Sequence, residues 1–246
     1  MKDLRLIMGM PIIVEVADPT VSQFDVDDIF DYFDYVDHKF STYKDDSEVS
    51  LLNAGKLSPE EYSDDLRLVL TLAAVTKQET NGFFDIYHQG KCDPSGIVKG
   101  WSIFNAAKLL EQKGFKNFYV DAGGDIQANG LNPDGVPWRV GIRHPFQQSA
   151  VVKVLAISNL GVATSGTYLR GQHIYNPREP DEPLTDIVSL TVIGPDVYEA
   201  DRMATAAFAM GRAGLKFIAG LTGLEGYQID KGGQATMTEG FEKFCV

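Results

Sequence analysis

The stretch 93–130 constrains the fold of this chain more than any other stretch does. It contains two turns that are rich in small residues, and each turn carries a carboxylate. The first turn, Asp93-Pro94-Ser95-Gly96, is typical of a helix start, because Asp and Ser cap free amides, Pro fixes φ and Gly leaves the backbone open. An anion placed there would meet unpaired amides and the positive end of a helix, with Lys99 nearby. The stretch therefore predicts a place where a ligand can touch backbone.

The rest of the stretch predicts a helix followed by a buried strand. Apolar residues at helical spacing indicate a helix over 97–113, and Gly114 is typical of a helix stop. The short aromatic run 118–120 favours a strand that delivers Asp121 and Asp125 to either side of a Gly-Gly turn. The alternative interpretation is a pair of ordinary capped turns in an α/β segment.

Size and charge narrow the class of protein. The 246 residues, 44% hydrophobic and 23% charged, predict a single domain over 1–246, or two intimate lobes with no clear linker. The 22 Lys and Arg residues against 34 Asp and Glu give a net charge of −12, with a pI near 4.7. This balance argues against a nucleic-acid partner or an anionic membrane. A bound phosphate would have to be held locally, by amides, a lysine or a divalent cation.

The cysteines and the apolar runs indicate a cytoplasmic protein. Cys92 and Cys245 are too few for a disulfide framework and lack metal-ligand spacing, so a reducing compartment is the simpler expectation, with Cys92 a buried thiol. The first ten residues hold no apolar run of signal-peptide length. No later stretch approaches the roughly 18 apolar residues of a transmembrane segment.

The remaining pattern alternates helices with strands. An apolar stripe beside an acidic face predicts an amphipathic helix over 25–40. Apolar–polar alternation over 138–143 and 151–157 predicts neighbouring antiparallel strands. Further helices are expected over 64–80, 199–210 and 213–219, and further strands over 4–16, 162–166, 185–193 and 226–230.

One predicted helix carries two residues that could bind the same metal ion. Asp201 and Thr205 are four residues apart, so both project from one helical face and offer the hard oxygen ligands that Mg²⁺ prefers. Two oxygens do not complete an octahedron, so carbonyls, waters and a substrate phosphate would supply the others. A capped first helical turn is the alternative explanation of this pair.

Taken together, blocks spread over most of the chain resemble the FAD:protein FMN transferases, also called the ApbE or thiamine-biosynthesis-lipoprotein family. No block is decisive alone, but all occur in the family's order. The blocks are Met8-Gly9, Ser41-Thr42-Tyr43, Asp46-Ser47-Glu48-Val49-Ser50, Asn53, Asn81-Gly82-Phe83-Phe84-Asp85-Ile86, 93–100, Gly123-Gly124-Asp125-Ile126, Ala163-Thr164-Ser165-Gly166, 173–177, and Ala200-Asp201 to Thr205 with Gly211.

The resemblance implies an α+β fold of the ApbE type, with mixed or antiparallel sheets packed against helices. It also implies a Mg²⁺-dependent reaction in which FAD is cut at its pyrophosphate. The FMN half is then joined to a Thr or Ser hydroxyl of an acceptor protein, and AMP leaves.

The family's functional residues carry over by position. His173 matches the family's His and is the first candidate for the proton acceptor; Asp85 and then Asp125 rank below it, and a structural His is the alternative. The residues that would line the FAD site are Met8, Tyr43, Phe83, Phe84, Asp85, Asp93, Lys99 and Tyr175. The Mg²⁺ ligands would be Asp201, Thr205 and the carbonyls of Gly96 and Ala204. Each aromatic residue alone is equally consistent with core packing.

The chain also departs from the family pattern. Asp85 and Asp93 are only eight positions apart, where many relatives have several dozen residues between these motifs. Asn176 stands where the family has Asp before Pro177, and Ser95 replaces a common Gly. The shortening leaves two other functions open: a protein that binds FAD without transferring FMN, and a Mg²⁺-dependent pyrophosphatase that yields free FMN and AMP.

Overall fold

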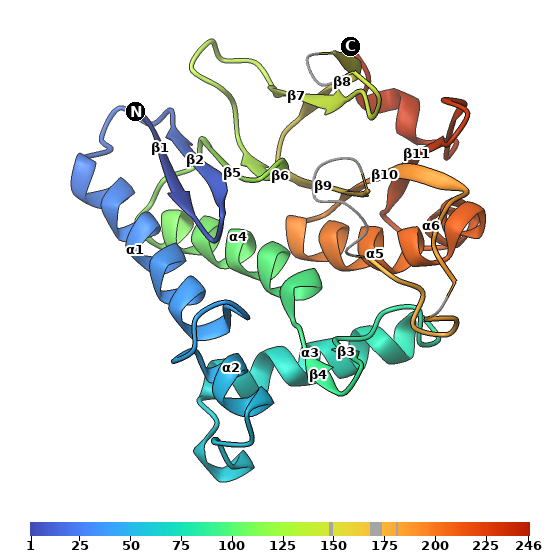
Figure 1. Ribbon diagram of the computed structural model, residues 1–246. Helices are drawn as coiled ribbons and strands as arrows, with labels where there is room; N and C mark the ends of the chain where they lie inside the picture. The colour runs from blue at the N-terminus through green and yellow to red at the C-terminus, as the bar shows by residue number, and fades with distance from the viewer. Residues whose placement is uncertain (148–149, 168–173, 181) are drawn as a thin grey trace.

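An eight-stranded antiparallel sheet forms the centre of the molecule (Figure 1). The computed structural model describes residues 1–147, 150–167, 174–180 and 182–246. All the neighbouring strands of this sheet run antiparallel to each other. In spatial order the strands are β1 (Lys2–Ile7), β2 (Met10–Val16), β5 (Phe118–Ala122), β6 (Asp125–Asn129), β9 (Leu160–Gly166), β10 (Ile187–Gly194), β11 (Glu225–Asp230) and β12 (Ala235–Met237). The expected α+β class with antiparallel sheets is confirmed.

Four helices cover one face of the sheet: α1 (Gln23–Phe40), α4 (Ser95–Gln112), α5 (Val197–Ala209) and α6 (Gly214–Ala219). Figure 1 shows α1, α4 and α5 below the strands. The predicted apolar stripe of α1 is buried, with Ile29 and Phe33 fully excluded from water, so the helix forms because its apolar face has the sheet to cover. Ser22 caps its start through a reciprocal bond with Asp25.

A two-stranded hairpin covers part of the opposite face. Strands β7 (Trp138–Arg143) and β8 (Val151–Ile157) pair antiparallel, as predicted, and the side chains of β7 alternate between buried and exposed. The buried side chains pack with alternate residues of β6, β9 and β11 and with the 3-10 turn η3 (Phe241–Phe244). In Figure 1 this hairpin lies on the side of the sheet away from α5.

A smaller layer lies beyond the helices, at the bottom of Figure 1. It contains α2 (Glu48–Asn53), η1 (Pro59–Glu61), α3 (Asp64–Glu79) and the short hairpin of β3 (Tyr87–His88) and β4 (Lys91–Cys92). The side-chain amide of Asn53 donates to the carbonyl of Cys92 at 2.8 Å and accepts from the Cys92 amide at 2.7 Å. Gln89 and Gly90 both have positive φ, which suits a two-residue turn. The hairpin spans most of the short distance between Asp85 and Asp93.

The local signals at helix ends were largely confirmed. Gly114 follows α4 with φ +92°, the left-handed stop predicted from the sequence. At the start of α4, however, no side chain caps the helix from its N-cap residue, Pro94. Asp93 instead accepts from the Ser95 amide at 3.0 Å, so the expected capping by Ser95 is wrong. Cys92 is a buried thiol, as predicted, and burial raises its pKa to about 11.

Across the described part of the chain, no helix combines the length and the apolar composition needed to cross a membrane.

Candidate active site

A cavity of about 900 Å³ opens where the start of α4 meets α5, the loop after α3 and the β3–β4 hairpin. Its volume is in the range of small-ligand and cofactor sites. Nine of the residues singled out in the sequence line it: Phe83, Phe84, Asp85, Asp93, Gly96, Lys99, Tyr175, Asp201 and Thr205. The fold thus brings together blocks that are more than one hundred residues apart in the chain.

Helices α4 and α5 touch at Gly100 and Asp201. The Gly100 amide donates to Oδ2 of Asp201 at 2.7 Å. A Cβ at position 100 would lie 2.6 Å from the Cβ of Asp201 and 3.0 Å from the carbonyl of Val197. Glycine destabilises a helix interior by about 1 kcal/mol relative to alanine. Here it allows the two helices to approach closely enough to fix the Asp201 carboxylate.

Lys99 joins two buried carboxylates at the floor of the cavity. Its Nζ lies 2.5 Å from Oδ2 of Asp125 and 3.4 Å from Oδ1 of Asp201. Asp125 and Asp201 are each only 2% exposed, and Asp125 also accepts from the Thr164 amide at 2.9 Å. The sequence placed Lys99 beside an incoming anion; the structure shows that its charge is already paired with carboxylates.

Burial raises the pKa of Asp201 to about 7; Lys99 opposes this rise and the charge of Asp125 adds to it. An ionised Asp201 in this place therefore depends on a nearby positive charge.

Thr205 lies one helical turn after Asp201 and faces the same cavity. Its hydroxyl is 3.5 Å from that of Ser165, and its methyl group lies 3.3 Å from the position of a Cβ at Gly96. Gly96 therefore lies against Thr205, and Gly96, Asp201 and Thr205 line the same cavity. Within the described ranges, no three His, Cys, Asp or Glu side chains group together to hold a metal ion. Carboxylate and hydroxyl oxygens nevertheless fit a hard cation that keeps waters or substrate oxygens as further ligands.

Aromatic rings form another wall of the cavity. Phe84 is almost fully buried and its ring lies 3.4 Å from the position of a Cβ at Gly96. The Phe83 ring lies beneath the guanidinium of Arg178, at 4.9 Å. The rings of Tyr175 and His88 lie 4.0 Å apart, which joins the loop at 174–180 to the β3–β4 hairpin. His88 was not predicted as a site residue, because no sequence pattern indicated a strand of two residues.

Hydrogen bonds hold this wall in place. The Tyr175 hydroxyl donates at 3.2 Å to the carbonyls of Asp85 and Tyr87. Burial raises the pKa of Tyr175 to about 12, so its hydroxyl keeps its proton near neutral pH. The Asp85 carboxylate pairs with Lys77 at 2.6 Å and accepts from the Tyr87 amide at 3.0 Å. These contacts give Asp85 a role in shaping the hairpin at the cavity edge.

Three of the residues predicted to bind FAD or Mg²⁺ do not line the cavity in the described part of the chain. Met8 is half-buried in the turn between β1 and β2, with φ +55°, and packs against the core. Tyr43 is 95% exposed. Ala204 is fully buried among the core residues of α5, so only its backbone is a possible ligand. His173 lies outside the described residues.

Relatives of known activity are similar to part of the chain. The FAD:protein FMN transferase of Escherichia coli (strain K12) is 32% identical over 166 residues, covering 63% of this chain and 47% of that protein. The protein of the same name from Vibrio cholerae is 36% identical over 128 residues, covering 48% of this chain and 38% of that protein. The chain therefore spans about half the length of the relatives that it matches, or less.

Solved structures share the fold over nearly the whole chain. The flavin transferase ApbE from Vibrio cholerae superposes with a TM-score of 0.85 at 23% sequence identity, covering 99% of this chain and 98% of that one. The ApbE protein of Thermotoga maritima gives a TM-score of 0.85 at 21% identity, with the same coverage of both chains.

A family model matches most of the chain. The ApbE family model matches residues 8–92 and 87–228, two segments that together span most of the sequence. They overlap at 87–92, in the β3–β4 hairpin. The chain belongs to the ApbE family.

Proposed function

We propose that this protein transfers FMN from FAD to a Thr or Ser hydroxyl of an acceptor protein, in a Mg²⁺-dependent reaction that releases AMP. The observation that carries the proposal is one cavity whose aromatic wall adjoins buried carboxylate and hydroxyl oxygens at the start of α4. A flavin nucleotide has the matching parts, because it joins flat rings to a charged diphosphate. Family membership and the names of the relatives point to the same chemistry.

The proposed ligands of Mg²⁺ are the Asp201 carboxylate, the Thr205 hydroxyl and the carbonyls of Gly96 and Ala204. The donor set suits a hard cation, and a cation bound there would oppose the effect of burial, which raises the pKa of Asp201. When bound, Mg²⁺ would neutralise charge on the diphosphate and so favour cleavage between its two phosphorus atoms. Lys99 would keep Asp125 neutralised and thereby limit the repulsion between Asp125 and Asp201.

For the flavin nucleotide itself, the proposed contacts are the rings of Phe83, Phe84 and Tyr175 and the Gly96 amide at the start of α4. Flat apolar faces suit the isoalloxazine or adenine ring. The Gly96 amide suits a phosphate oxygen, since it lies in the first turn of a helix, whereas the Ser95 and Ile97 amides already donate to Asp93 and to the Pro94 carbonyl. Asp85 and Asp93 would act indirectly, because their carboxylates bond to Lys77 and to the Ser95 amide. Met8 and Tyr43 have less support as FAD contacts, since neither lines the cavity.

In the proposed reaction, the acceptor hydroxyl oxygen bonds to the phosphorus of the FMN half. The bond from that phosphorus to the bridging oxygen breaks, and AMP leaves with that oxygen. The hydroxyl proton passes to a base, for which His173 is the first candidate and Asp85 the second. The ion pair between Asp85 and Lys77 favours this order, since it engages the Asp85 carboxylate with α3.

Product analysis tests the proposal. The protein is incubated with FAD, Mg²⁺ and a polypeptide that carries an acceptor Thr, and the products are separated under denaturing conditions. Flavin attached to the polypeptide, with an equal amount of AMP, supports the transferase. Free FMN and AMP with an unmodified polypeptide identify a pyrophosphatase, and intact bound FAD identifies a flavin carrier. The control variant Asp201→Ala should produce neither AMP nor attached flavin.

A further inference from the structure

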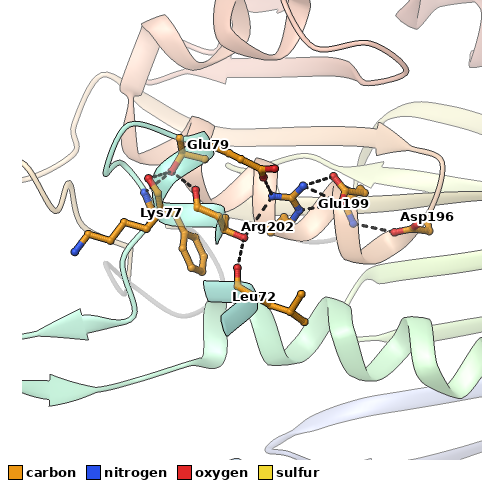
Figure 2. Close-up of polar contacts among 9 residues, drawn as sticks. Leu72, Lys77, Glu79, Asp196, Glu199 and Arg202 are labelled. Carbon is orange, nitrogen blue, oxygen red and sulfur yellow. Dashed lines mark hydrogen bonds and ion pairs between the residues drawn. The ribbon is translucent and has the colours of Figure 1, made fainter. Parts of the chain in front are cut away.

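Arg202 follows Asp201 on α5 and is 7% exposed, although it bears a charge. Its guanidinium donates to both carboxylate oxygens of Glu199 on the same helix, with Nη2 at 2.6 Å from Oε2 and Nε at 3.0 Å from Oε1. Nη1 donates to Glu79, the last residue of α3. Figure 2 shows Arg202 between these two glutamates, with Glu199 beside the N-cap residue Asp196. One side chain thus joins the end of α3 to the first half of α5.

The contacts continue from Arg202 toward the cavity wall. Nη1 of Arg202 also lies 3.4 Å from the Thr76 hydroxyl, which donates to the Leu72 carbonyl at 2.8 Å. The Thr80 hydroxyl donates to the Thr76 carbonyl at 2.7 Å and accepts from the Phe84 amide at 3.1 Å. Phe84 lies only five positions after Glu79 in the chain. The position of the Phe84 backbone is therefore tied to the end of α3, and the end of α3 is tied to Arg202.

Phe84 and α5, which carries Arg202, also come together inside the cavity. Thr205 lies three residues after Arg202 on α5, and a Cβ at Gly96 would touch both the Thr205 methyl and the Phe84 ring. The aromatic wall and the oxygen donors are thus set by two chain segments, α3 with its following loop and α5. Arg202 is the charged contact between these segments.

The charges of Arg202, Glu79 and Glu199 favour a stable contact between α3 and α5. Burial tends to lower the pKa of Arg202, but hydrogen bonds to Glu199 and Glu79 outweigh it and raise the pKa. The Glu79 and Glu199 side chains are 46% and 30% exposed, so they keep part of their hydration. A planar guanidinium can bond to both at once, whereas an ammonium cannot reproduce that fork.

We infer that Arg202 is a positioning residue: it holds the loop containing Phe83, Phe84 and Asp85 against the helix that carries Asp201 and Thr205, so that both walls of the cavity form together. The ligand that this arrangement serves rests on the proposed function. The contact between the two segments stands on the structure alone.

Two substitutions separate positioning from general stabilisation. Arg202→Met removes the guanidinium and keeps a similar length of apolar chain. Glu79→Ala removes the ion pair with the end of α3 and keeps the pair with Glu199 and the 3.4 Å contact with Thr76, and alanine is well tolerated in a helix. Arg212→Met is the matched control, since the Arg212 side chain is 64% exposed and pairs with Asp230 away from the cavity.

The first readout is amide hydrogen exchange of the 246-residue chain without ligand, followed over residues 80–87 and over the sheet. We expect Arg202→Met and Glu79→Ala to speed exchange in 80–87 by about tenfold or more, which corresponds to a loss of about 1.4 kcal/mol of local stability. The strands and the Arg212→Met control should exchange as in the parent protein. Unchanged exchange in 80–87, or an equal increase throughout the sheet, would overturn the inference.

The second readout is FAD affinity, from the quenching of flavin fluorescence. We expect Arg202→Met and Glu79→Ala to weaken FAD binding by about tenfold and Arg212→Met to leave it unchanged. Arg202→Lys should recover only part of the affinity. Weakened exchange protection with full FAD affinity would reject the positioning role. If the parent protein itself binds no FAD, the proposed function fails, while the exchange experiment still decides whether Arg202 holds the loop.

Discussion

The contact between α4 and α5 leads to the sharpest mutational prediction, Gly100→Ala. A methyl group at position 100 would lie 2.6 Å from the Cβ of Asp201 and 2.9 Å from its Oδ2. Carbon atoms in contact prefer about 3.5–4.0 Å, so the helices must separate by about 1 Å. That movement stretches the 2.7 Å bond from the Gly100 amide to Asp201.

The size of the effect follows from three contributions. Overpacking a core costs about 1–3 kcal/mol, and weakening a hydrogen bond to a buried charged group costs about 1.5–3 kcal/mol. The higher helix propensity of alanine offsets about 1 kcal/mol of this loss of stability. We therefore expect a loss of about 1.5–5 kcal/mol in the free energy of unfolding. Because a displacement of about 1 Å can lower turnover about a hundredfold, activity should fall much more than the folded fraction.

Denaturant unfolding and Mg²⁺-dependent AMP release measure the two effects separately. The matched control is Gly220→Ala, at the end of α6, where the backbone has φ −83° and a Cβ would meet its nearest atom at an ordinary 3.4 Å. The control should change the free energy of unfolding by less than about 1 kcal/mol and leave turnover intact. Parent-like stability and turnover in Gly100→Ala would refute the argument that this glycine fixes Asp201.

Three further predictions concern the same cavity. Lys99→Met leaves Asp125 and Asp201 without their shared cation, so the metal-free variant should lose about 3 kcal/mol of stability, and Mg²⁺ should raise its melting temperature more than that of the parent; an equal Mg²⁺ effect on both proteins argues against a cation site here. The folded-state pKa of Asp201, about 7, is raised above its ordinary value of 3.8, so its carboxyl favours folding at low pH, and this contribution is lost as pH rises from about 4 to 7. Chemical unfolding of the metal-free protein should therefore show a downward slope in this window that Asp201→Asn flattens, whereas identical slopes in the two proteins would show that Asp201 does not titrate there. Tyr175→Phe removes the single hydroxyl proton that the Asp85 and Tyr87 carbonyls share, a loss of about 0.5–1.5 kcal/mol, and should weaken FAD binding several-fold in a fluorescence titration; unchanged affinity would show that the hairpin is held by other contacts.

Sequence patterns predicted the parts of the fold that depend on local order. The apolar stripe over 25–40 has a helical period and belongs to α1, and the alternation in 138–143 has a strand period and belongs to β7. Gly114 was expected to end a helix and does so with positive φ. These features were predictable because neighbours in the chain determine them.

The contacts within the cavity were harder to predict. Lys99 and Asp125 lie on different elements, and their pairing depends on how α4 packs beneath β6. The β3–β4 hairpin has strands of two residues, too short for any periodic signal, so His88 was missed. Arg202 looked like an ordinary charged residue of a helix, since its partner Glu79 is more than one hundred positions away. The family resemblance named Asp201 and Thr205, but only the fold shows what surrounds them.

A crystal structure with FAD and Mg²⁺, solved on an Asp85 or His173 variant that slows turnover, tests the central claim most directly. We predict a divalent cation about 2.1 Å from the Asp201 carboxylate and the Thr205 hydroxyl, with the flavin diphosphate among its other ligands. FAD bound in the cavity with its diphosphate away from Asp201 and Thr205, or a cation held by other residues, would contradict it.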